Sequence, residues 1–214
     1  MQPALAVIDI DITSDQDELA RERLVENLKN CTQQFISPLW VSLMRERADL
    51  RVVCLVNDLV QFDDFLVDVI RSVPGVRGTS AQMAFDGVVR GEPLMDVALV
   101  NKVWDRRAAA TVLVKTQPGL DREVYQALVS LPRHGQVEVV WVVKLFHSRD
   151  ADLQLLLLGE RTSALTGYVM GQVRTLPGVV DTQLTSVLEW LILGHTEDFI
   201  ALTQRFREPE QRVG

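Results

Sequence analysis

Cysteine and histidine are scarce in this chain, which has two cysteines and three histidines among its 214 residues. Cys31 and Cys54 lack metal-ligand spacing, and no pattern of the His-Glu-x-x-His kind joins His134, His147 and His195. So little cysteine excludes a disulfide scaffold and fits a reducing cytosol. The sequence therefore predicts no metal site, and it gives no indication of a cofactor.

Long hydrophobic runs are also missing. No apolar stretch approaches the roughly 20 residues needed to cross a bilayer. The N-terminus, MQPALAVIDIDIT, has no basic region ahead of an apolar stretch and a small-residue cleavage site, so it does not read as a signal peptide. We expect a cytoplasmic protein with no membrane contact.

Positive charge is in deficit, with 22 Lys and Arg against 29 Asp and Glu and a net charge of −7. Phosphate neutralisation needs clustered basic residues, but here they are interleaved with acids, as in Arg45-Glu46-Arg47. The first expected strand begins near Ala4, which leaves no room before it for a recognition helix. We expect the chain alone to bind duplex DNA weakly and without sequence preference.

An internal repeat organises the chain. Ala48-Asp49-Leu50 recurs as Ala151-Asp152-Leu153, and Pro74-Gly75-Val76 recurs as Pro177-Gly178-Val179, both with an offset of 103 residues. Such a constant offset indicates a tandem duplication. The sequence predicts a first unit over 1–103 and a second over 104–214, each with a trailing helix.

Each unit shows the same order of strand and helix signals. In the first, Ile8, Ile10 and Ile12 alternate with acids, as in a half-buried strand. The expected strands are 4–13, 36–45, 49–57 and 76–89, then 110–116, 137–147, 153–159 and 180–193. The first expected helix follows Ser14 and has an apolar face made of Leu19, Leu24, Val25 and Leu28. The other expected helices span 59–73, 120–131 and 162–176. Amphipathic trailing helices are expected over 93–104 and 197–207.

The order βαββαβ predicts an α+β fold of two tandem ferredoxin-like units. Helices cover one face of a four-stranded antiparallel sheet and leave the other in need of cover. The second strands are largely apolar on both faces, around Trp40 and Trp141. We expect the two sheets to pack face to face as a pseudo-dimer of the dimeric α/β-barrel kind.

The second unit resembles the ligand-binding domain of Lrp/AsnC-type regulators. The resemblance rests on 111–116, Pro118-Gly119, 151–156, Leu176-Pro177-Gly178-Val179 and Thr182. It implies a βαββαβ domain that dimerises face to face and often assembles into rings. Members of that family carry a helix-turn-helix before this domain, which this chain lacks ahead of its first expected strand.

In the resembled family, effectors sit near the loop before the third strand and near threonines of the fourth. An aspartate there could bind an α-amino group through a charge-assisted hydrogen bond. The alternative is that Asp49 and Asp152 only accept turn amides. The resemblance gives these candidate ligand-binding residues: Asp49, Thr79, His147, Arg149, Asp152 and Thr182.

Three functions compete. No nucleophile elbow or Gly-rich phosphate loop is present, so the leading expectation is a non-enzymatic, stand-alone effector-binding and oligomerisation module, possibly for an amino acid. The alternatives are a dimeric α/β-barrel enzyme of the monooxygenase or tetrapyrrole type, and a structural partner of a DNA-binding relative. The expected partners are a small-molecule effector, a DNA-binding regulator and further copies of the chain. Self-association is expected from two apolar faces: Leu94, Leu99 and Val103, and Phe199, Leu202 and Phe206.

Overall fold

The computed structural model describes residues 3–13, 17–31, 35–45, 49–90, 107–131, 136–146, 148 and 150–206. The strands are β1 (Ala4–Ile12), β2 (Ile36–Met44), β3 (Leu50–Val56), β4 (Val76–Val89), β5 (Ala108–Thr116), β6 (Val137–Phe146), β7 (Leu153–Gly159) and β8 (Val179–Ile192). The helices are α1 (Asp17–Lys29), α2 (Leu59–Phe65), α4 (Asp121–Val129), α5 (Thr162–Tyr168) and α6 (Thr196–Arg205). The π-helical segments η1 (Leu66–Arg71) and η3 (Val169–Val173) extend α2 and α5. The trailing helix expected over 93–104 lies outside the described residues.

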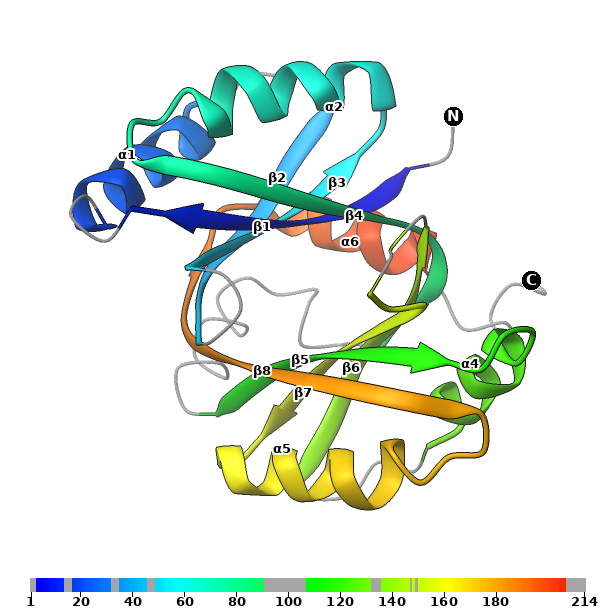
Figure 1. Cartoon of the computed structure of the whole chain (residues 1–214). Coiled ribbons are helices and arrows are strands. Elements are labelled where there is room, and N and C mark those ends of the chain that lie inside the picture. Colours follow the sequence, from blue (N-terminus) through cyan, green and yellow to red (C-terminus); the bar gives the residue numbers. More distant parts are fainter. Residues whose placement is uncertain are drawn as a thin grey trace.

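All eight strands form one closed antiparallel barrel in the order β1-β3-β2-β8-β5-β7-β6-β4. Within it, β4-β1-β3-β2 and β8-β5-β7-β6 are two four-stranded sheets of the same strand order. Figure 1 shows these sheets as two layers, with α1 and α2 on the outside of one and α4 and α5 on the outside of the other. The fold is thus a mixed α+β fold, as expected.

The two sheets are joined along their edges as well as facing each other. Strand β2 pairs with β8, and β4 pairs with β6. A side chain at Gly87 would meet Val142 O at 2.7 Å, so glycine lets β4 approach β6 closely there. The expectation of face-to-face packing captured the facing layers but missed the two edge junctions.

The barrel interior contains one apolar cluster. Trp40 stacks on Trp141 with ring centroids 5.3 Å apart and on Phe199 of α6 at 6.2 Å. Aromatic pairs at such spacing add stability beyond the area they bury. The tryptophans of the two second strands therefore meet at the centre of the molecule, where each half contributes one.

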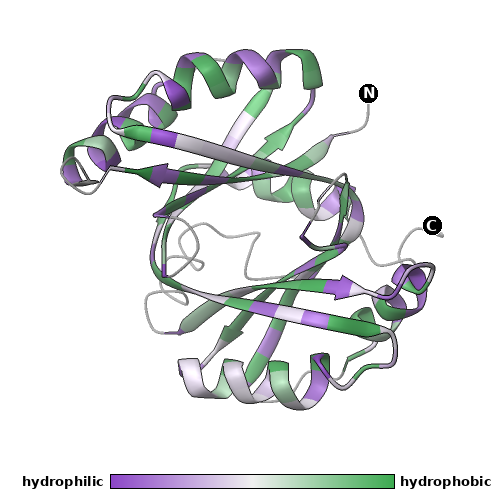
Figure 2. Ribbon diagram, in the orientation of Figure 1, coloured by the Kyte–Doolittle hydropathy of each residue, from purple (hydrophilic) through white to green (hydrophobic). Residues whose placement is uncertain are grey.

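Two further cores are present, one between the first sheet and its helices and one between the second sheet and its helices. On α1 the buried residues are Ala20, Leu24 and Leu28, whereas Leu19 is 48% exposed, so its expected place on the apolar face was wrong. Gly75 and Gly178 have φ values of 98° and 89°, which glycine adopts without strain where each helix ends. Figure 2 shows hydrophobic residues concentrated in the strands that separate these cores.

Helix α6 folds back onto its own barrel. Phe199, Leu202 and Phe206 are completely buried in the interior cluster. In Figure 1, α6 lies on the inner side of the first sheet, between the two layers. This apolar face therefore gives no reason for self-association, and the matching face at Leu94, Leu99 and Val103 lies outside the described residues.

The strand register shows how the halves correspond. Ala4 pairs with Val56 as Ala108 pairs with Gly159, so the first strands correspond with an offset of 104 rather than 103. In the second strands, Ile36 pairs with Val56 and Val137 pairs with Gly159, so these strands correspond with an offset of 101. The one-residue difference explains why the alternation of the first strands shifts phase under the offset of 103.

Candidate functional site

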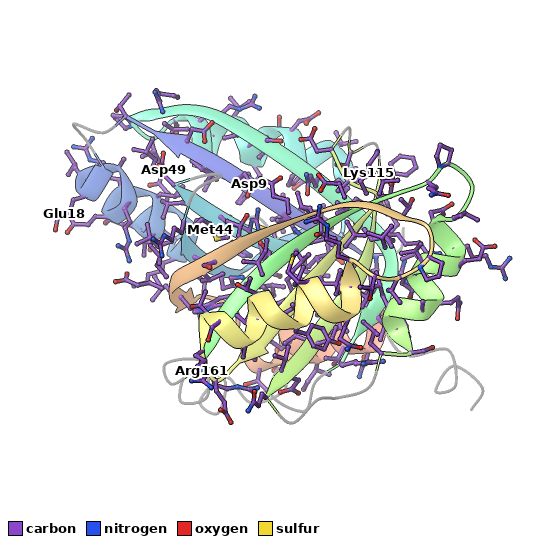
Figure 3. All side chains as sticks on the ribbon, turned by 60° about the horizontal axis from the view of Figure 1, so that its bottom comes forward. Asp9, Glu18, Met44, Asp49, Lys115 and Arg161 are labelled. Carbon is purple, nitrogen blue, oxygen red and sulfur yellow. The ribbon has the colours of Figure 1, made fainter. Side chains whose placement is uncertain are left out.

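A pocket of about 430 Å³ lies at one end of the first half, between α1 and the sheet. Its volume falls in the range typical of small-molecule sites. Its lining combines four apolar residues with three charged ones: Ile12, Leu43, Met44 and Leu50, and Glu18, Arg21 and Asp49. Figure 3 shows Glu18, Met44 and Asp49 at the end of the molecule where α1 lies.

Asp49 is fixed at the end of β1. Its Oδ2 accepts a hydrogen bond from the Ile12 backbone N–H at 2.5 Å, and its own N–H donates to the Ile10 carbonyl at 3.1 Å. Among the described residues, Oδ1 of Asp49 has no hydrogen-bond or ion-pair partner. The aspartate is therefore held rigidly by one oxygen and presents the other.

Arg21 supplies the cation at the pocket but is already engaged. Its guanidinium pairs with Glu189 of β8, which belongs to the other half of the barrel. Both side chains of this pair are partly exposed. The pair thus bridges α1 to the β2–β8 junction and leaves the carboxylates Glu18 and Asp49 without a dedicated cation among the described residues.

Asp152 is the structural counterpart of Asp49. Its Oδ2 accepts hydrogen bonds from the Thr116 backbone N–H at 2.8 Å and the Thr116 hydroxyl at 2.9 Å. Its Oδ1 accepts from Lys115 Nζ at 3.3 Å. Burial alone would raise the pKa of Asp152, but these hydrogen bonds and the Lys115 charge outweigh it and lower that pKa.

In the second half, two large side chains occupy the positions that correspond to the wall of the pocket. Tyr125 of α4 corresponds to Arg21 of α1, and Lys144 of β6 corresponds to Leu43 of β2. Lys144 Nζ lies 4.5 Å from the Tyr125 ring centroid and 2.9 Å from Asp86, whose counterpart is Glu189. Tyr125 is 5% exposed, so its ring is packed at this position, whereas Arg21 in the first half is partly exposed.

A buried polar layer crosses the barrel interior. Arg51, 2% exposed, donates from Nε to Asp9 Oδ1 at 2.6 Å and from Nη2 to Asp9 Oδ2 at 3.1 Å. Its Nη1 donates to the hydroxyl of Thr111, which lies on β5 of the other half. A bidentate carboxylate pair of this kind is strongly directional. The hydrogen bond from Arg51 to Thr111 links the two halves inside the barrel.

Gln154 is the counterpart of Arg51 and makes no such link. It is completely buried, and neither amide atom has a hydrogen-bond partner among the described residues. Its cross-strand neighbours Leu113 and Val143 are apolar. A buried amide without partners costs stability, so the first half has the paired version of this layer and the second half the unpaired one.

The remaining candidate residues do not gather at the pocket. The Thr79 hydroxyl accepts from Arg71 Nε at 2.8 Å, on the far side of β1 from Leu50. The Thr182 N–H donates to Asp181 Oδ1 at 2.8 Å on β8. His147 and Arg149 lie outside the described residues. Of the four candidates in the described part of the chain, Asp49 alone lines the pocket.

Sequence reasoning missed the pocket walls and the polar layer. The position of Arg51 could have been recognised from the sequence. In β3 it alternates in step with Val53 and Leu55, whose side chains face the barrel interior, so its own side chain must face inward too. A charge at that position requires a buried partner, which is Asp9 on β1. Glu18 and Arg21 carried no such signal, because their role depends on the three-dimensional placement of α1.

Metal-binding and membrane-spanning features are both missing from the described part of the chain. No group of three His, Cys, Asp or Glu residues is placed to hold a metal ion there. The single histidine it contains, His195, begins α6, where its backbone N–H donates to Asp198 at 2.8 Å. No helix in the same part is long and apolar enough to cross a bilayer.

Comparison with known proteins shows the fold. No protein-family model matches the chain, and no curated protein matches it. A monooxygenase-like protein from Lactobacillus acidophilus is 7% identical with a TM-score of 0.55, covering 91% of this chain and 98% of its own. An anthrone oxidase-like protein is 10% identical with a TM-score of 0.55 and coverages of 91% and 94%. Chlorite dismutase from Candidatus Nitrospira defluvii is 13% identical with a TM-score of 0.55 and coverages of 94% and 94%.

These matches correct two expectations. The structural neighbours are monooxygenase-like and chlorite dismutase-like proteins, so the assignment to the Lrp/AsnC ligand-binding domain was wrong. The expectation of a non-enzymatic protein was contradicted as well, because the proteins that share this fold are monooxygenase-like, anthrone oxidase-like and chlorite dismutase proteins. The motif misled for a physical reason: Asp152 accepts a strand-end amide and Gly178 ends a helix, so both residues serve the fold.

Proposed function

We propose that this protein is an enzyme of the α+β barrel class that oxidises a small organic substrate with dioxygen in the pocket beside Asp49. The observation that carries the proposal is the pocket between α1 and the first sheet, which is lined by four apolar residues, two carboxylates and Arg21, in a fold that monooxygenase-like proteins share. Fold likeness alone is a weak argument for activity, so the pocket chemistry decides the reaction type.

The pocket suits a substrate with an apolar skeleton and an acidic C–H group. Ile12, Leu43 and Leu50 would hold the skeleton. Glu18 and Asp49 are the described carboxylates that could accept the proton as the C–H bond is attacked. In the reaction that we propose, a CH₂ group flanked by aromatic rings gains one oxygen atom of O₂ as a carbonyl. Its two hydrogens leave with the second oxygen atom as water.

Haem or another metal group is not assigned a step. The described residues offer no cluster of metal ligands. Their one histidine, His195, starts α6 at an exposed helix end. The residues present in the described part of the chain therefore do not fit such a group, and the chemistry that we derive rests on the carboxylates alone.

The two units, 1–103 and 104–214, are proposed to be a duplicated pair in which one site works and the other is closed. Supporting this, both halves share one strand order, and Tyr125 with Lys144 takes the place of Arg21 with Leu43. We also propose that the chain assembles with further copies of itself, which light scattering at micromolar concentration would test.

An oxygen electrode tests the proposed function. Anthrone and related reduced aromatic compounds are offered to the purified protein, with chlorite turnover measured in parallel for the runner-up activity. We expect oxygen uptake that Asp49→Asn reduces and that Asp152→Asn, the matched change in the other half, leaves intact. Oxygen uptake that is insensitive to Asp49→Asn, or turnover of chlorite alone, would contradict the proposal.

A further inference from the structure

The two halves of the barrel hold the same aspartate in the same way. Ile12 and Thr116 are the last residues of corresponding strands, and each donates its backbone N–H to Oδ2 of the aspartate that precedes the third strand. Because this anchor is shared, the other oxygen, Oδ1, stands in a comparable position in both halves. What Oδ1 contacts in one half is therefore informative about the other.

In the second half, Oδ1 of Asp152 is occupied by a cation. Lys115 Nζ lies 3.3 Å from it, at the penultimate position of β5. The corresponding position of β1 is Asp11, a carboxylate, and no described cation pairs with Asp49. The first half thus keeps the acceptor and has a carboxylate, Asp11, at the strand position where the second half has the lysine.

The pocket wall shows the same replacement. In the second half the Lys144 ammonium lies over the Tyr125 ring, a cation–π contact, and pairs with Asp86. In the first half the strand position is Leu43, which carries no charge. Arg21 takes over the pairing with the carboxylate of the joining strand, Glu189. Lys115 therefore has no cationic equivalent in the first half, whereas Arg21 keeps the kind of ion pair that Lys144 makes in the second half.

We infer that the pocket beside Asp49 takes an organic cation, a protonated amine on an apolar or aromatic skeleton. The ammonium group would bind Oδ1 of Asp49, as Lys115 binds Oδ1 of Asp152. The skeleton would lie against Met44, Leu43 and Leu50. A charge-assisted hydrogen bond to a rigidly held carboxylate gives such a ligand both affinity and orientation.

This inference rests on the proposed function for turnover, and it adds the substrate class. With Asp49 engaged by the ammonium group, Glu18 is the pocket carboxylate left to accept a proton. Binding of an amine does not itself require oxygen chemistry. The binding result and the oxygen-uptake result can therefore fail independently.

Ligand-observed NMR and calorimetry with matched probes test the inference. The probes are benzylamine, phenethylamine and tryptamine, each compared with its neutral alcohol and its carboxylate analogue of similar size. We expect at least one amine to bind about tenfold or more tightly than its alcohol, and the carboxylates to bind worst. Failure of every amine, or preference for the carboxylates, overturns the inference.

Three variants locate the binding. Asp49→Asn keeps an oxygen for the Ile12 N–H but removes the charge, so amine affinity should fall about tenfold or more. Asp152→Asn makes the same change in the closed half and should leave amine affinity unchanged. Arg21→Tyr with Leu43→Lys copies the closed half into the pocket and should abolish binding. Circular dichroism and thermal unfolding confirm that each variant is folded, and equal loss in Asp49→Asn and Asp152→Asn would contradict the assignment.

The combined results separate the two proposals. Amine binding without oxygen uptake supports the inference and overturns the proposed oxidation. Oxygen uptake with neutral aromatic compounds, together with no amine binding, supports the oxidation and overturns the inference.

Discussion

Removing one partner of the Asp9–Arg51 pair should cost much more stability than removing both. Arg51 is 2% exposed, and three of its N–H donors are taken by Asp9 and Thr111. Asp9→Leu would leave the guanidinium buried without its counter-ion, which destabilises proteins by about 3–5 kcal/mol. Arg51→Met would leave the Asp9 carboxylate, 9% exposed, without its main donor, and we expect a cost of about 1–3 kcal/mol.

The double variant Asp9→Leu with Arg51→Met should lie within about 1 kcal/mol of the wild type, because two apolar side chains of similar volume replace the ion pair. The coupling free energy from the double-mutant cycle should therefore be about 3 kcal/mol or more, well above that of exposed ion pairs. Thr111 loses a donor in both Arg51 variants, so its contribution cancels in part.

Urea unfolding at pH 7 measures the cycle. Circular dichroism and tryptophan fluorescence should give coincident transitions, because Trp40 and Trp141 lie in the same interior cluster. If the double variant loses as much stability as the sum of the two single variants, Asp9 and Arg51 are not coupled, and the view that they stabilise the barrel interior as a pair fails.

Three further predictions concern Gln154, Cys54 and Asp152. Replacing Gln154 with Leu should raise the free energy of unfolding by about 1 kcal/mol or more, since both buried amide atoms lack a described partner; a lower urea midpoint would contradict this. Burial, with a smaller effect from Cys31, raises the pKa of Cys54, so a thiol reagent should modify Cys31 but not Cys54 until the protein is unfolded, as mass spectrometry would show. The pKa of Asp152 is lowered in the folded state, so its contribution to stability is present above the ordinary carboxyl value of about 3.8 and is lost as pH falls below it. Wild type should therefore lose stability over that acid range more steeply than Asp152→Asn, and parallel curves would disprove it.

Much of the secondary structure could be predicted from the sequence. β4 (Val76–Val89) and β7 (Leu153–Gly159) match their expected bounds, because a glycine turn or charged residues limit each strand. Leu19 was misplaced because helix periodicity alone does not decide which of two neighbouring apolar residues faces the sheet, and Ala20 took that place.

The candidate site was less accessible from the sequence. Asp49 was identified through the repeat, but the same repeat made Asp152 an equal candidate. The difference between them depends on Lys115 and on the contact of Lys144 with Tyr125, both of which arise between separate elements. A family motif could not distinguish Asp49 from Asp152, because the motif consists of residues that hold the ends of strands and helices in place in both halves.

Barrel closure makes the two halves dependent on each other for folding. Each half alone would have β2 and β4, or β6 and β8, as uncovered edge strands, with unpaired backbone groups that invite aggregation or exchange between chains. The pairing of Trp40 with Ile192 joins residues 152 positions apart, so this junction must form late, after a costly loop closure. During synthesis, the first half must therefore wait with both edges exposed until β6 and β8 emerge. The same edges would allow two chains to exchange halves and form a domain-swapped dimer without any new type of contact.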